Sequence, residues 1–126
     1  MPKKILDAPS GPAPVGPYSV AVEANGFVFI SGQGALDPST NQLIVGGVEA
    51  ETEQVMKNIG AILADVGLGF DDIVKTTIFL ADMDDFPLVN AVYGSYVADA
   101  KPARSTVEVA RLPLDINVEI DVIAAR

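Results

Sequence analysis

Two apolar segments, residues 18–24 and 27–33, flank the dipeptide Asn25-Gly26. Segments of this length that are rich in β-branched and aromatic residues are typical of strands. Asn-Gly between two such segments is the preferred sequence of a two-residue hairpin with a type I′ turn. The register pairs four residues from each segment: Ala24 with Phe27, Val22 with Phe29, Val20 with Ser31, and Tyr18 with Gln33. This hairpin would place the phenol of Tyr18 near residues 31–33.

A helical period of apolar residues characterises two later segments. Residues 48–66 are predicted to form a helix because apolar side chains recur at i, i+4, i+7, i+8 and i+11, at Val55, Ile59, Ile62, Leu63 and Val66. Gly67 is suited to the C′ position that follows. A second helix is predicted over residues 86–98, and Asn90 lies on its apolar stripe. A carboxamide on a packing face must be hydrogen-bonded, so Asn90 either ties down a neighbouring loop or lines a pocket.

Three further strands are predicted at residues 72–80, 103–109 and 117–124. The resulting order, β-β-α-β-α-β-β, predicts an α+β fold in a single domain over residues 1–126, with a mostly antiparallel sheet and both helices on one face. Residues 27–30 and 78–80 are apolar at consecutive positions, and therefore on both faces of the sheet. Since the helices cover only one face, another subunit is the simplest candidate to cover the other.

The strand that follows Pro102 carries the main candidate for chemistry, Arg104. Pro102 cannot donate to a ladder, so the strand should begin just after it. Alternation places Arg104, Thr106 and Glu108 on one face. An arginine among apolar neighbours needs an anionic partner, because burying an unpaired charge is costly. That partner is either one of the chain's own carboxylates or the carboxylate of a ligand, which suits the guanidinium fork.

Composition narrows the classes of function. The chain has 17 acidic and 8 basic residues and a formal net charge of −9, which disfavours nucleic acid and anionic membranes as main partners. It has no histidine and no cysteine, which excludes a histidine-based triad, a thiolate nucleophile and an ordinary zinc site. Neither a signal peptide nor a membrane span is recognisable, and we expect a cytoplasmic protein.

Several ordered blocks of the sequence together resemble the RidA/YjgF family of enamine/imine deaminases. The matching blocks run from the N-terminal third of the chain to its last strand: residues 14–19, 31–33, 74–80 and 82–86, then Val89, Asn90 and Tyr93, and finally residues 102–105, 107–113 and 118–120. Any one block would be a weak match, but their order and number make the resemblance specific.

The resemblance implies a chorismate-mutase-like α+β fold and a homotrimer with active sites between neighbouring subunits. The implied reaction is the hydrolysis of 2-aminoacrylate and related 2-imino acids to 2-keto acids and ammonium, without a cofactor. The resemblance assigns carboxylate binding to Arg104 and the activation of water to Glu119. Five further positions would line or support the site: Tyr18, Ser31, Gly32, Asn90 and Thr106.

The chain departs from the family pattern at Val20, at Gly34-Ala35 and at Val97. These departures concern substrate preference and loop shape more than the class of reaction. A non-catalytic module that binds small carboxylates is the alternative from another functional class. An endoribonuclease-type translation inhibitor, a description also attached to the family, is the weaker candidate for an acidic chain without histidine.

Overall fold

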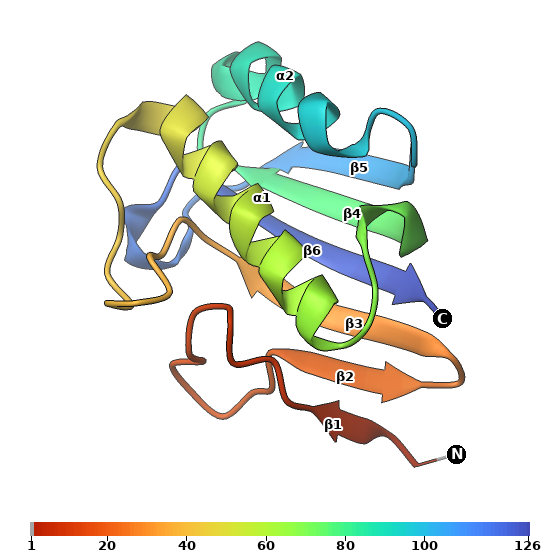
Figure 1. Ribbon diagram of the computed structural model, residues 1–126. Helices are drawn as coiled ribbons and strands as arrows, with labels where there is room; N and C mark the ends of the chain where they lie inside the picture. The colour runs from red at the N-terminus through yellow and green to blue at the C-terminus, as the bar shows by residue number, and fades with distance from the viewer. Residues whose placement is uncertain (1) are drawn as a thin grey trace.

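A computed structural model describes residues 2–126, which form one twisted six-stranded sheet with two helices packed on one face (Figure 1). The strands lie in the order β1-β2-β3-β6-β4-β5. Their bounds are β1 (Lys4–Leu6), β2 (Ala21–Ala24), β3 (Phe27–Gln33), β4 (Ile73–Leu80), β5 (Ala103–Glu108) and β6 (Val118–Ala125); the helices are α1 (Gly47–Asp65) and α2 (Phe86–Val97). The predicted fold class and element order are confirmed.

The structure adds the strand β1, which the sequence pattern did not predict. Lys4, Ile5 and Leu6 pair with Glu23, Val22 and Ala21 of β2 at the edge of the sheet. Three residues are too few to display a period, and their pairing partner lies far along the chain. The segment between β1 and β2 contains no helix, as its many prolines predict.

The hairpin of β2 and β3 has the predicted register from Ala21–Ile30 to Ala24–Phe27. Asn25 and Gly26 have φ of 53° and 81°, the left-handed conformations that a type I′ turn requires. The predicted pairing of Tyr18 with Gln33 is wrong, because the ladder of β2 begins only at Ala21. A turn in which the Tyr18 N–H donates to the Gly16 carbonyl bends the chain before β2.

The core lies between the sheet and the two helices. Alternate residues of the strands point toward the helices and are fully buried, such as Ile78 and Leu80 of β4 and Val118 and Ile120 of β6. They pack against α1, whose buried residues include four of the five on the predicted stripe: Val55, Ile59, Ile62 and Leu63. Each such side chain contributes about 1.5–3 kcal/mol when it is fully removed from water. Gly67, at φ 81°, follows the C-cap of α1 as predicted.

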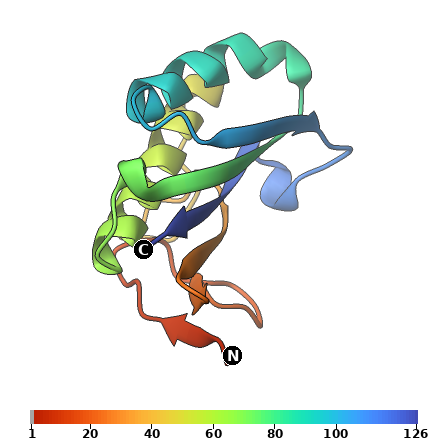
Figure 2. The same cartoon turned by 90° about the vertical axis from the view of Figure 1, so that its right-hand side faces the viewer.

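Helix α2 connects β4 to β5, which is the one strand that pairs in parallel. A parallel pair needs a crossover of this kind, and the crossover sets α2 directly against β5 (Figure 2). In the register, Arg104 lies opposite Thr76, and Thr106 lies opposite Ile78. Both partners are buried on the helix side, so Arg104 and Thr106 share that face of the sheet, as the alternation predicted.

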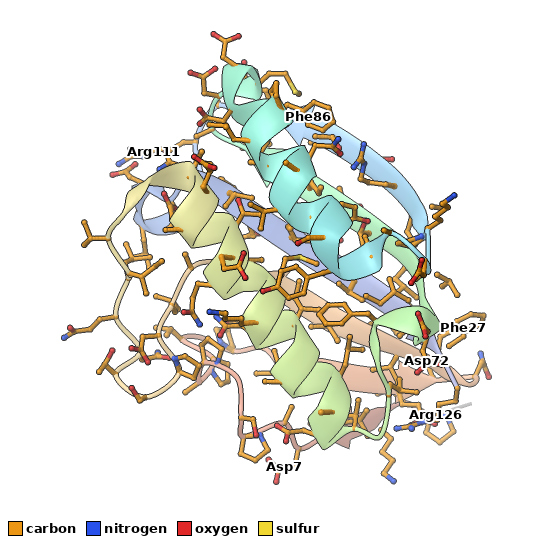
Figure 3. The ribbon with its side chains drawn as sticks, turned by 45° about the horizontal axis from the view of Figure 1, so that its top comes forward. Asp7, Phe27, Asp72, Phe86, Arg111 and Arg126 are labelled. Carbon is orange, nitrogen blue, oxygen red and sulfur yellow. The ribbon has the colours of Figure 1, made fainter. Side chains whose placement is uncertain are left out.

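The sheet face away from the helices carries several exposed apolar side chains. Phe27 and Phe29 are each 43% exposed, and Val107 of β5 is 40% exposed. Figure 3 shows Phe27 near Arg126, at the end of the sheet where the chain terminates. A subunit covering this face remains an expectation that the single chain does not test.

Candidate functional site

The guanidinium of Arg104 is held by the facing side of α2. Its Nη1 donates a hydrogen bond of 2.6 Å to the Asn90 Oδ1. The rings of Phe86 and Tyr93 flank it, each with its centroid 5.3 Å from the guanidinium carbon. Because Phe86, Asn90 and Tyr93 are spaced at i, i+4 and i+7, they form one stripe of the helix. Of the two roles left open for Asn90, it takes the second, because it lines a cavity, and it also orients the Arg104 guanidinium.

The Tyr93 ring is also held by a hydrogen bond to β4. Its hydroxyl lies 2.7 Å from the Thr76 Oγ1 in a buried hydrogen bond. Thr76 is the residue opposite Arg104 in the β4–β5 ladder. The ring that flanks the guanidinium is therefore tied to the strand next to it.

Arg104 forms no salt bridge with any side chain of residues 2–126. The ion pairs within residues 2–126 join Arg111 to Asp115 and Arg126 to Glu23, each at 2.8 Å. Arg104 is exposed in the single chain rather than buried, which corrects the expectation of an apolar environment. A cavity of about 500 Å³ adjoins it, lined also by Asn90, Tyr93 and Lys101. The structural ion pair, one of the two alternatives for this residue, is thus absent from the part of the chain that the structure describes, and the guanidinium is available to an external anion.

Glu119 lies in a second cavity, of about 560 Å³, together with Tyr18, Ser31 and Gly32. It is half-buried on β6, between the buried Val118 and Ile120, and its side chain is on the sheet face away from the helices. Burial raises the pKa of the Glu119 carboxyl above its usual value, and the charge of Asp121 raises it further. A carboxylate with a raised pKa is a better proton acceptor near neutral pH.

Because Gly32 has no side chain, there is room beside it for the Glu119 carboxylate. A Cβ at Gly32 would lie 2.5 Å from the Glu119 Oε2 and 2.8 Å from the carboxyl carbon. Ser31 donates a hydrogen bond of 2.6 Å from its Oγ to the Ser19 carbonyl, which joins β3 to the segment that carries Tyr18. The Tyr18 hydroxyl accepts a hydrogen bond of 3.3 Å from the Val15 N–H. Tyr18, Ser31, Gly32 and Glu119 therefore lie together around one cavity.

The predicted residues nevertheless form two groups on opposite faces of the sheet. Arg104, Asn90 and Thr106 lie on the helix side of β5, and the Thr106 Oγ1 is buried there without a hydrogen-bond partner among residues 2–126. Glu119 lies opposite Phe79 in the β4–β6 ladder, on the other side. One chain therefore does not bring Arg104 and Glu119 to a common substrate.

Sequence reasoning missed two sets of residues around these groups. The apolar period of residues 86–98 places Phe86 and Tyr93 on one stripe with Asn90, at i, i+4 and i+7, but does not show that their rings flank Arg104. The apolar wall of the Glu119 cavity includes Leu36, Leu114 and Ile116, which come from two separate loops. No local sequence signal brings these loops together.

Within the part of the chain that the structure describes, no group of three or more acidic side chains is placed to hold a metal ion. None of the helices in residues 2–126 combines the length and the apolar composition needed to cross a bilayer.

Comparison with known proteins gives consistent matches over the whole chain. The family model described as endoribonuclease L-PSP matches residues 8–126. A RutC family protein of Synechocystis is 54% identical over 98% of this chain and 97% of its own length. The 2-iminobutanoate/2-iminopropanoate deaminase of Mus musculus is 46% identical over 98% of this chain and 92% of its own length.

Solved structures have the same fold. A Rid family protein of Yersinia pestis, described as of unknown function, matches with a TM-score of 0.95 and 42% identity, over 99% of this chain and 100% of its own. E. coli TdcF, solved with bound serine, matches with a TM-score of 0.90 and 36% identity, over 98% and 99% of the two chains.

Proposed function

Because this chain belongs to the RidA/YjgF family, we propose that it hydrolyses reactive 2-imino acids to 2-keto acids and ammonium. The substrates are 2-aminoacrylate and its imine tautomer 2-iminopropanoate, and 2-iminobutanoate. The observation that carries the proposal is the Arg104 guanidinium, which α2 orients through Asn90, Phe86 and Tyr93. No carboxylate among the described residues 2–126 forms a salt bridge with it. A guanidinium held in this way can donate two parallel hydrogen bonds to the planar carboxylate of such an acid.

In the proposed mechanism, Arg104 binds the substrate carboxylate and so positions the C=N carbon. A protonated imine is already electrophilic, so water needs only a base. Glu119 accepts a proton as the water oxygen bonds to C2 and the π electrons of C=N move to nitrogen. It then returns that proton to nitrogen. The C–N bond breaks with its electron pair going to nitrogen, while Glu119 accepts the hydroxyl proton as the keto group forms and passes it to the released ammonia. Ammonium and the 2-keto acid are the products, and general base help of this kind contributes about 10²–10⁴-fold.

The two groups of residues would meet between subunits. Arg104 and Glu119 lie on opposite faces of the sheet, so one subunit would supply Arg104, Asn90 and Thr106 and its neighbour would supply Glu119, Tyr18, Ser31 and Gly32. The exposed apolar side chains of the sheet's open face are suited to burial in such an assembly. We propose a homotrimer, in which each of three interfaces completes one site.

A coupled assay tests the reaction. Addition of the protein to a threonine dehydratase reaction should accelerate the release of the 2-keto acid. Arg104→Ala should abolish the acceleration, because the substrate carboxylate loses its partner. Lys57→Ala is the matched control, since it removes an exposed cation of α1 that lies in neither cavity. Full activity in Arg104→Ala would contradict the proposal.

A non-catalytic binding module is the second candidate, because the Arg104 fork alone would bind small carboxylates. The serine bound in the TdcF structure is a small molecule with such a carboxylate. Calorimetry with pyruvate separates the two functions. If pyruvate binds but the wild type does not accelerate ketoacid release, the chain is a binding module and not a deaminase.

A further inference from the structure

Helix α1 carries a buried carboxylate that the proposed hydrolysis does not use. Glu51 is 7% exposed, and no other charged side chain of residues 2–126 is buried. No lysine or arginine in this part of the chain forms a salt bridge with it. A buried carboxylate lowers the stability of a fold unless hydrogen bonds or an opposite charge compensate for it. The hydrogen-bond partners of Glu51 therefore indicate what the chain gains from this residue.

The hydrogen bonds to the Glu51 carboxylate come from Asn117, the residue before β6. The Asn117 N–H donates to the Glu51 Oε1 at 3.1 Å, and the Asn117 Nδ2 donates to the Glu51 Oε2. The Asn117 carbonyl accepts a hydrogen bond of 3.0 Å from the N–H of Ala81, the residue after β4. Asn117 thus joins the start of β6 to α1 and to the end of β4.

Glu119 lies two residues beyond Asn117, where the sheet is paired regularly on one side alone. On the β4 side, the ladder extends past Glu119 to the first residue of β6. On the β3 side, the register shifts between Ile30 and Gln33, and the ladder ends at Ile120. Such irregularities disrupt the pairing of a strand and are common beside active sites. The position of Glu119 therefore depends on how the start of β6 is held.

We infer that Glu51 is a positioning residue of the proposed reaction: through Asn117 it fixes the start of β6, and thereby the place of the Glu119 carboxylate. The inference rests on the proposed function, in which Glu119 is the base. Glu51 does not line the Glu119 cavity, so it acts through the backbone of β6 and not on the substrate. A carboxylate suits this role because its two oxygens accept from the backbone and from the side chain of one residue, which holds Asn117 at two points.

Glu51→Met tests the inference, because methionine is unbranched, fills irregular space and has no oxygen to accept these hydrogen bonds. In the imine hydrolysis assay, kcat should fall about tenfold or more, as expected for a displaced base. Pyruvate affinity measured by calorimetry should remain that of the wild type, because Arg104 supplies it. A merely stabilising role would lower the melting temperature without this split between kcat and affinity.

Glu51→Gln should restore wild-type kcat. Its side-chain oxygen can accept from the Asn117 N–H, and its amide nitrogen can donate to the Asn117 carboxamide oxygen once that group turns over. Thr52→Val is the control, because the Thr52 hydroxyl is also buried on α1 but donates only to the Val48 carbonyl of the same helix, at 2.7 Å. Both kcat and pyruvate affinity should be unchanged in Thr52→Val.

Three results would overturn the inference: wild-type kcat in Glu51→Met, an equal loss of kcat and pyruvate affinity, or a Glu51→Gln variant as impaired as Glu51→Met. If Glu51→Met does not fold, Asn117→Ala takes its place, since it removes the side-chain hydrogen bond and leaves the backbone one. The same split is then expected, and wild-type kcat in Asn117→Ala would overturn the inference.

Crystal structures separate failure of this inference from failure of the proposed function, because they need no turnover. If the wild type hydrolyses no imine, the proposed function fails. The Glu119 carboxylate should still be displaced by about 1 Å or more in Glu51→Met, a shift large enough to impair a base, and should return to its place in Glu51→Gln. An undisplaced carboxylate in Glu51→Met would overturn the inference whether or not the chain is a deaminase.

Discussion

At the scale of single residues, Arg104 and Glu119 are held in opposite ways. Arg104 is exposed, and the α2 groups that contact it, a carboxamide and two ring faces, carry no charge that would neutralise it. Glu119 is half-buried beside another carboxylate, Asp121, and both burial and that charge disfavour its ionised form. The first arrangement preserves a cation for an anionic ligand, and the second raises the basicity of the carboxylate.

The raised pKa of Glu119 predicts the pH dependence of turnover. Only the carboxylate can accept a proton from water, so kcat/KM should fall as the pH is lowered through this pKa. Burial, and then the charge of Asp121, raise the pKa of Glu119. The fall in kcat/KM should therefore begin at a higher pH than it would for an exposed glutamate, whose pKa is about 4.3. Asp121→Asn removes the neighbouring charge and should shift the acid limb to lower pH.

Measurement of kcat/KM between pH 4 and 9 for the wild type and for Asp121→Asn checks this prediction. The same imine is used for both proteins, so that ionisation of the substrate affects the two pH profiles equally. Asp99→Asn, at an exposed carboxylate on the loop after α2, is the control and should leave the limb in place. An unchanged limb in Asp121→Asn would remove Glu119 from its proposed role as the base.

Gly32→Ala should lower turnover while the chain stays folded. The added Cβ would lie 2.5 Å from the Glu119 Oε2, so the carboxylate must move away from its position. A misplaced base costs roughly 10²-fold in rate. Assay of kcat together with thermal unfolding checks the outcome, and Gly69→Ala is the control because a Cβ there meets nothing within 4 Å. Wild-type kcat in Gly32→Ala would show that the position of Glu119 is not critical.

At the scale of elements, the α2–β5 contact explains why Arg104 remains free. The stripe of Phe86, Asn90 and Tyr93 faces β5 because the parallel crossover from β4 places α2 beside that strand. A neutral carboxamide at position 90 orients the guanidinium without neutralising it. A carboxylate of the same shape would neutralise it.

Asn90→Asp should therefore weaken the binding of the substrate carboxylate to Arg104. Its carboxylate would lie where the Asn90 Oδ1 now lies, 2.6 Å from the Arg104 Nη1, and would compete with the substrate carboxylate. Pyruvate affinity measured by calorimetry should fall at least about tenfold, as expected when a charged pair must be broken for binding. Ser95→Asp adds the same charge at an exposed position of α2 and serves as the control. Equal affinities in Asn90→Asp and wild type would show that Arg104 is not the carboxylate-binding group.

The elements also show where sequence reasoning succeeds and where it ends. Asn25-Gly26 specifies its own turn, so the hairpin register near it was predictable from two residues. The period of α1 likewise reports its buried face. The Tyr18–Gln33 pairing failed because the β2–β3 ladder begins only at Ala21 and Tyr18 lies at a turn in which its N–H donates to the Gly16 carbonyl. No residue type marks where this ladder begins. The strand β1 and the wall around Leu114 depend on contacts between segments far apart in the sequence, which a local pattern does not contain.

At the scale of the whole molecule, the two sheet faces have different uses. The helix face forms the core and positions Arg104, whereas the open face carries Glu119 and exposed apolar side chains such as Phe29. A site that needs both faces cannot form within one chain. The proposed reaction thus requires assembly, and light scattering with size exclusion should report three subunits.

Mixing two inactive variants tests whether the sites lie between subunits. Arg104→Ala and Glu119→Gln should each lack turnover, but trimers reassembled from an equal mixture contain interfaces with an intact Arg104 from one subunit and an intact Glu119 from the next. Random assembly with a head-to-tail interface makes about one quarter of the sites complete, so about one quarter of wild-type activity should return. Each variant refolded alone is the control. No recovery from a mixture whose hybrid trimers are verified by native mass spectrometry would mean that the two residues do not act in one site between neighbouring subunits.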